Sequence, residues 1–172
     1  MRAGVPVNPH TARDGARAAS AHDPRGRRGT ASVATALEAR GLLRAAQRIA
    51  VVGASPDPTR PSHDVMRYLL AAGYDCVPVN PSVPEILGRS TFPDLASATA
   101  AGGRFDIVDV FRRPEATPEI AREAVAAGAG VLWLQLGIVN QEAARIAADG
   151  GLAVVMDRCT KIEHRAMLAE GV

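Results

Sequence analysis

The sequence predicts an α/β protein with a Rossmann-like, doubly wound fold: a parallel five-stranded sheet between two helical layers, in three-layer α/β/α order. Five short apolar runs alternate with segments of helical periodicity along residues 49–168. The runs are nearly continuous in apolar residues, which is typical of parallel strands that are buried on both faces. Right-handed crossovers between such strands then place helices on both sides of the sheet.

Length and composition limit the classes of protein that fit. A chain of 172 residues has room for one domain, and 47% apolar with 3% aromatic residues predicts an aliphatic core. A net charge of +2 argues against a nucleic-acid partner. Two cysteines give no disulfide framework, and no apolar run is long enough to span a membrane. Without a secretory signal pattern, we expect a cytoplasmic protein.

The chain divides into a tail and a domain. Residues 1–30 lack apolar periodicity and are expected to form a disordered tail, and residues 31–172 are expected to form the Rossmann-like domain. An amphipathic helix is predicted over residues 32–48, ahead of the first strand. The strands are then predicted at residues 49–53, 75–79, 105–111, 130–135 and 152–157.

Helices are predicted after each strand, and several of them have recognisable ends. The second helix of the chain, at about residues 63–72, has Ser62 as a suitable cap and Gly73 after its end. A short helix is predicted between residues 94 and 101. Helix starts are also predicted at Thr117 and Asn140, and Thr160 with Glu163 matches a capping box.

Ligands of such sheets bind beyond the carboxyl ends of the strands, and polar or backbone-permissive residues gather there. Gly53, Ala54 and Ser55 follow the first strand, and Arg60 and Ser62 precede the next helix. A glycine-containing turn at a helix N-terminus can bind a phosphate through backbone N–H groups. We interpret this segment as an anion cradle, with a simple turn as the alternative.

The other strand ends supply further candidates. The second strand is followed by Asn80 and Pro81, where a plain turn and a binding role remain equally open. The third ends in Phe111 and Arg112; we expect either Arg112 or Arg113 to be only a solvated corner. The remaining candidates follow the fourth strand and are Gln135, Leu136 and Gly137. After the fifth strand, Asp157 either pairs with Arg158 or caps the last helix.

Several known phosphate and metal signatures are absent from the sequence. The dinucleotide motif G-x-G-x-x-G would need glycine at positions 53, 55 and 58, which read Gly, Ser and Pro, and the second strand ends without an acidic residue. No P-loop motif occurs. His63 has no second histidine or carboxylate at ligand spacing, so we predict no metal site.

Six motifs in chain order give a resemblance to a family. They are V-V-G-A-S (51–55), R-P-S (60–62), P-V-N-P (78–81), D-I-V-D-V-F-R-R (106–113), W-L-Q-L-G-I (133–138) and M-D-R-C (156–159) followed by K-I-E-H (161–164). Over about residues 45–168 the chain resembles the small bacterial CoA-binding proteins. These are similar to the N-terminal CoA-binding domain of the succinyl-CoA synthetase alpha subunit.

The resemblance implies that coenzyme A binds at the carboxyl rim. Gly53, Ala54 and Ser55 would then wrap its phosphates, Arg60 would add charge, and Asn80 with Pro81 would border the nucleotide. Phe111 and Arg112 would line the crevice for the adenine or the pantetheine, and residues 135–137 would close the far side. The resemblance implies no agreed catalytic residue.

We therefore interpret the chain as a non-catalytic module for CoA or an acyl-CoA, with no catalytic residue assigned and enzymatic activity left open. One alternative is an acyl-CoA-handling enzyme that uses Cys159 or His164. Another is a nicotinamide-nucleotide sensor, although residues 1–48 show no helix-turn-helix. A homodimer or an unknown protein partner also stays open.

Overall fold

The centre of the structure is a five-stranded parallel sheet, and this confirms the predicted fold class. The computed structural model describes residues 31–171, so the tail predicted at residues 1–30 lies outside the described residues. The strands lie side by side in the order β2-β1-β5-β6-β7. Their bounds are Arg48–Val52 for β1, Asp75–Val79 for β2, Ile107–Val110 for β5, Val131–Leu134 for β6 and Ala153–Val155 for β7.

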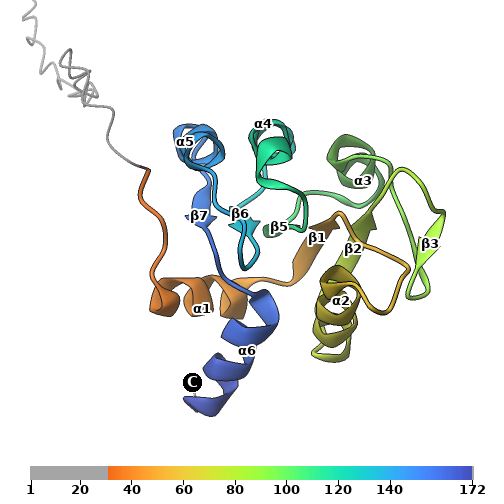
Figure 1. Ribbon diagram of the computed structural model, residues 1–172, viewed down its shortest axis with the longest axis horizontal. Coiled ribbons are helices and arrows are strands. Elements are labelled where there is room, and N and C mark those ends of the chain that lie inside the picture. The colour runs from red at the N-terminus through yellow and green to blue at the C-terminus, as the bar shows by residue number, and fades with distance from the viewer. Residues whose placement is uncertain (1–30, 172) are drawn as a thin grey trace, which may run out of the picture.

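Helices cover both faces of this sheet and make the three predicted layers (Figure 1). One layer contains α3 (Leu95–Gly102), α4 (Thr117–Ala126) and α5 (Gln141–Asp149). The other contains α1 (Ala36–Ala45), α2 (Pro61–Ala71) and α6 (Thr160–Ala169). A short antiparallel pair, β3 (Glu85–Ile86) and β4 (Arg89–Ser90), lies in a stretch where the sequence predicts no regular element.

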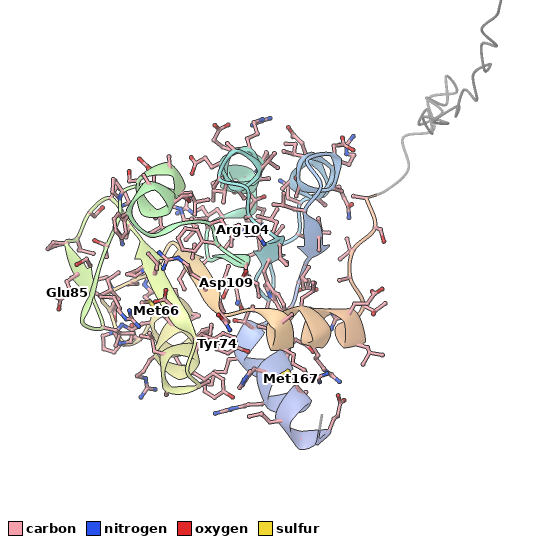
Figure 2. All side chains as sticks on the ribbon, turned by 180° about the vertical axis from the view of Figure 1, so that it is seen from behind. Met66, Tyr74, Glu85, Arg104, Asp109 and Met167 are labelled. Atoms are coloured by element: carbon pink, nitrogen blue, oxygen red, sulfur yellow. The ribbon has the colours of Figure 1, made fainter. Side chains whose placement is uncertain are left out.

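Side chains alternate between the two core layers along each strand, as the pleat requires. On β5, Val108 and Val110 pack on the side of α3, α4 and α5, whereas Ile107 packs on the side of α1, α2 and α6. The alternation puts Asp109 on the side of Ile107. Asp109 is 0% exposed, so a carboxyl group lies inside an otherwise apolar strand (Figure 2).

The strand order fixes where a ligand site can form. The chain leaves β1 through α2 to reach β2 on one side, and it later places β5 on the other side of β1. The connections after β1 and β5 therefore diverge. In doubly wound sheets this switch in direction opens a crevice beyond the carboxyl ends of the two strands. Val52 is in register with both Val79 and Val110, so the three strand ends lie level.

Two of the predicted helix starts are confirmed. The Asp94 side chain caps α3 by accepting from the amide of Ser97, and the Asn140 side chain caps α5 by accepting from the amide of Ala143. The first helix is shorter than predicted because a capping box at Thr35 and Glu38 starts it only at Ala36.

The other three predicted caps are wrong. Ser62 is the second residue of α2, whose cap position is held by Arg60, because Pro61 takes the first helical position. Thr117 is already inside α4, after a 3₁₀ turn at Pro114–Ala116. Thr160 is the first residue of α6, and its hydroxyl donates to the Asp109 carboxylate instead of capping the helix.

Candidate functional site

A cavity of about 570 Å³ lies at the carboxyl ends of β1 and β5, at the predicted rim. It brings together most of the residues that the sequence singles out there. Pro81 and Gly137 do not line it. The lining residues are Gly53, Ala54, Ser55, Arg60, Pro61, Ser62, Val65, Asn80, Phe111, Arg112, Gln135, Leu136, Ile138, Cys159 and Ile162.

Gly53 turns the chain sharply where β1 ends. Its φ is +85°, in the left-handed region, and a Cβ there would come within 2.9 Å of both the Arg112 Cδ and the Phe111 carbonyl oxygen. Only glycine satisfies both the conformation and the space. The close approach brings the first loop against the end of β5, so the two edges of the crevice are in direct contact.

Side chains from two other elements hold the loop after Gly53 in place. The Asn80 Nδ2 donates to the Ala54 carbonyl over 2.8 Å, and the His63 Nδ1 donates to the Ser55 carbonyl over 2.9 Å. Because both carbonyls accept hydrogen bonds from these side chains, the loop is held in its conformation before a ligand binds. Asn80 and His63 therefore both stabilise the loop. No group of three or more His, Cys, Asp or Glu side chains within residues 31–171 is arranged to hold a metal ion.

The loop end of the cavity favours an anion. The N-terminus of α2 opens there, and its first-turn N–H groups carry partial positive charge. Ser62 is 4% exposed, and its hydroxyl makes no hydrogen bond to any of residues 31–171 although it borders the cavity. Arg60 and Arg112 add two exposed guanidinium groups to the same end. Arg60 is 3.9 Å from the nearest Asp57 oxygen, which is a weak, exposed pairing.

The other end of the cavity is apolar. Leu136 and Ile138 come from the loop after β6, and Cys159 and Ile162 come from the start of α6. Leu136 is 62% exposed and Ile162 is 56% exposed, so this end has apolar walls and is open to solvent. Ile138 and Ile162 are not among the residues predicted for the site. The polar group in this part of the cavity is Gln135, which is 4% exposed.

Gln135 belongs to a closed ring of hydrogen bonds with Asp109 and Thr160. Its Nε2 donates to the Asp109 Oδ1 over 2.7 Å and to the Thr160 Oγ1 over 2.8 Å. The Thr160 hydroxyl in turn donates to the Asp109 Oδ2 over 3.0 Å. Burial raises the pKa of the Asp109 carboxyl to about 7, against the lowering effect of these hydrogen bonds. Of these three residues, only Gln135 is among those predicted for the site.

The two predicted residues outside the cavity shape its surroundings. Gly137 has a φ of +80°, and its amide donates to the Asp157 Oδ1 over 2.7 Å. Both alternatives considered for Asp157 are thus wrong, since Arg158 pairs with Glu163 and α6 has no side-chain cap. Pro81 is an exposed turn residue beyond Asn80.

The candidate reactive residues lie apart from one another. Cys159 is half-buried and lines the cavity. His164 is 6% exposed, and its Nδ1 lies 2.9 Å from the Tyr68 hydroxyl, beside a different hollow of the surface. Desolvation lowers the pKa of His164. Cys76 is buried in the core, and burial raises the pKa of its thiol to about 12, so this thiol is inert.

Together the fold and the rim define an α/β protein with a crevice at the switch point of its sheet, lined at one end by groups suited to an anion. No helix within residues 31–171 is both long and apolar enough to cross a membrane. Residues 47–165 match the family model described as the CoA binding domain. The chain therefore belongs to the CoA-binding domain family.

The chain is also similar to individual proteins over most of their lengths. The chain is 42% identical over 127 residues to the uncharacterized protein YneT of Bacillus subtilis (strain 168), a match that spans 74% of this chain and 92% of YneT. A hypothetical protein from Pyrococcus horikoshii OT3 has a solved structure with a TM-score of 0.73 and 39% identity, covering 78% of this chain and 93% of that one. A solved structure from Thermus thermophilus has a TM-score of 0.69 and 37% identity, over 78% and 99% of the two chains.

Proposed function

We propose that the protein binds coenzyme A or one of its thioesters in the rim cavity and performs no chemistry on it by itself. The observation that carries the proposal is the polarity of the cavity. One end has a glycine turn, a helix N-terminus, two arginines and the buried Ser62 hydroxyl, and the other has apolar walls. Coenzyme A has the same division, with phosphates at one end and a neutral pantetheine arm at the other.

In this proposal the pyrophosphate lies against residues 53–55 and the N-terminus of α2, where N–H groups and the Ser62 hydroxyl can donate to it. Arg60 and Arg112 are free to pair with the phosphates because no strong ion pair holds either side chain within residues 31–171. The pantetheine arm then runs toward Leu136, Ile138 and Ile162. This assigns the far side of the crevice to the arm.

A nicotinamide dinucleotide is a poorer fit. Sites for NAD place an acidic side chain at the end of the second strand, where it accepts from the ribose hydroxyls. Here that position holds Asn80, whose Nδ2 donates to Ala54 and whose Oδ1 accepts from the amide of Ser82. The side chain is thus committed to the loop.

Titration calorimetry with CoA and NAD tests the proposal. We expect CoA to bind well above NAD, and Arg60→Ala and Arg112→Ala each to weaken CoA about tenfold, because a charge-assisted hydrogen bond contributes about 1.5–3 kcal/mol before screening at an exposed site. Added salt should weaken binding as well. Arg113→Ala is the matched control, since Arg113 is exposed next to Arg112 but does not line the cavity.

Two outcomes would contradict the proposal at different levels. NAD binding as tightly as CoA would remove the ligand assignment. Unchanged CoA affinity in both arginine variants would keep the ligand but reject the position of its phosphates.

Cys159 is expected to be accessible to the ligand but not required for binding. It lines the cavity, yet the two histidines of residues 31–171 are bonded elsewhere, His63 to the Ser55 carbonyl and His164 to Tyr68. Cys159→Ser should keep CoA affinity within about twofold, a change of less than 0.5 kcal/mol. Intact-mass analysis under oxidising conditions should show a CoA adduct on the unaltered protein that the variant lacks. Turnover of acetyl-CoA to free CoA that disappears in Cys159→Ser would instead establish the enzyme alternative.

A further inference from the structure

Asp109 is a buried carboxyl group that takes no part in the proposed phosphate site. It is 0% exposed, and no lysine or arginine of residues 31–171 forms an ion pair with it. Its partners are the neutral side chains of Gln135 and Thr160. Burying a carboxylate without a cation lowers the stability of the fold. Its position beneath the cavity therefore calls for a reason other than stability.

The hydrogen-bond ring fixes the orientation of the Gln135 carboxamide. The Thr160 hydroxyl has one proton, which it gives to the Asp109 Oδ2, and its oxygen accepts from the Gln135 Nε2. The same Nε2 also donates to the Asp109 Oδ1. Reversing the amide would turn its oxygen toward a carboxylate, which has no proton to offer. The ionised ring therefore holds Nε2 inward.

The Gln135 oxygen is left for the cavity. Its Oε1 accepts no hydrogen bond from residues 31–171, and it is not among the polar atoms sealed inside the described part of the chain. The residue as a whole is only 4% exposed, and it borders the cavity. The side chain that carries this acceptor thus borders the cavity, whose lining also includes Leu136, Ile138 and Cys159.

We propose that Asp109 and Thr160 act as positioning residues that present the Gln135 Oε1 to an amide N–H of the pantetheine arm. The inference rests on the proposed function, because it needs the arm at the apolar end. That arm is neutral, and it carries amide donors between aliphatic segments. An acceptor in an apolar channel matches this chemistry and gives no advantage to a phosphate, which has no donor when ionised.

The experiment compares two ligands that differ by this arm. Dephospho-CoA contains the ADP group and the arm, whereas ADP lacks the arm. In Asp109→Asn the new amide places a donor against the ring, which favours a reversed Gln135. At pH 8 we expect dephospho-CoA to bind about threefold to tenfold more weakly to this variant, the loss of one neutral hydrogen bond, and ADP affinity to change less than twofold.

A second pair of variants keeps the test valid if Asp109→Asn fails to fold. Thr160→Val removes the hydroxyl that closes the ring and should show the same selective loss. Thr160→Ser keeps the hydroxyl and should bind dephospho-CoA like the unaltered protein. Equal losses for both ligands, or no loss in either disrupted variant, would overturn the positioning role. Failure of both CoA and dephospho-CoA to bind the unaltered protein would remove the proposed function itself, and the inference with it.

The pH dependence of dephospho-CoA binding distinguishes a positioning role of Asp109 from a purely structural one, which would not alter it. Lowering the pH from 8 to 6 should weaken dephospho-CoA binding to the unaltered protein but not to Asp109→Asn, because a protonated Asp109 needs an acceptor from the ring. Other ionisable groups nearby are common to both proteins. On the elements packed around Asp109 these are His63, Asp64, Arg67, Tyr68, Asp75, Cys76, Cys159, Lys161, Glu163, His164 and Arg165.

Most of those groups have partners of their own. Lys161 pairs with Asp64, Glu163 pairs with Arg40 and Arg158, and His164 contacts Tyr68. His63 bonds the Ser55 carbonyl. All of these groups are unchanged in Asp109→Asn, so the difference between the two pH profiles isolates the effect of Asp109. A profile with the same slope in both proteins would contradict the inference.

Discussion

Replacing Gly53 by alanine is expected to weaken CoA binding by about tenfold or more and to lower the free energy of unfolding by about 2–4 kcal/mol. The left-handed φ of +85° costs about 1–2 kcal/mol in a residue with a Cβ. The new atom would also meet the Phe111 carbonyl oxygen at 2.9 Å, which is backbone and cannot rotate away. Relief of the clash must move the end of β5, and with it Arg112.

Gly73 provides the matched control. It too has a left-handed conformation, with a φ of +97°, but a Cβ there would meet no atom within 4 Å. Gly73→Ala should therefore share the conformational cost of about 1–2 kcal/mol while leaving CoA affinity unchanged. Chemical denaturation and calorimetry on both variants separate the two contributions. Equal losses of stability in the two variants, with CoA affinity kept in Gly53→Ala, would show that the crevice tolerates the displacement.

The fold was predictable because its signals are local. Each buried strand is a short apolar run, and each turn is marked by a residue with special backbone freedom, as at Gly53 and Gly73. Most of the cavity lining was predictable for the same reason, since Asn80, Phe111 and Gln135 each follow a strand directly. Once the sheet is parallel, the ends of its strands must meet at one rim.

The features that were missed depend on contacts between distant parts of the chain. The Asp109 ring joins residues that are 51 positions apart, and no local pattern pairs an acid in one strand with a threonine at the start of the last helix. The same contact explains the wrong cap at Thr160, because its hydroxyl is taken by Asp109. The wrong start at Ser62 had a local signal that was available, namely a proline at position 61.

Asp109 should also make the stability of the protein fall as the pH rises. Its carboxyl has a pKa of about 7 in the folded protein, against an ordinary value of 3.8. Between these values the unfolded chain is ionised and the folded protein is protonated, so a higher pH favours unfolding. The contribution of this group is fully present below about pH 4 and is lost by about pH 7, a change on the order of 4 kcal/mol.

Chemical denaturation of the unaltered protein and Asp109→Asn at pH 4 to 8 measures this contribution as a difference, so that other titrating groups cancel. The variant should gain stability relative to the unaltered protein up to about pH 7, with no further change above it. Asp106→Asn is the control, because amide donors from Arg48 and Gln47 outweigh the desolvation of Asp106 and lower its pKa. Its difference curve should be flat from pH 4 to 8, because a lowered pKa confines the titration of Asp106 to lower pH, where the slope has the opposite sign. Parallel curves for Asp109→Asn and the unaltered protein would mean that the buried carboxyl stays ionised throughout, held by Gln135 and Thr160 more strongly than burial opposes it.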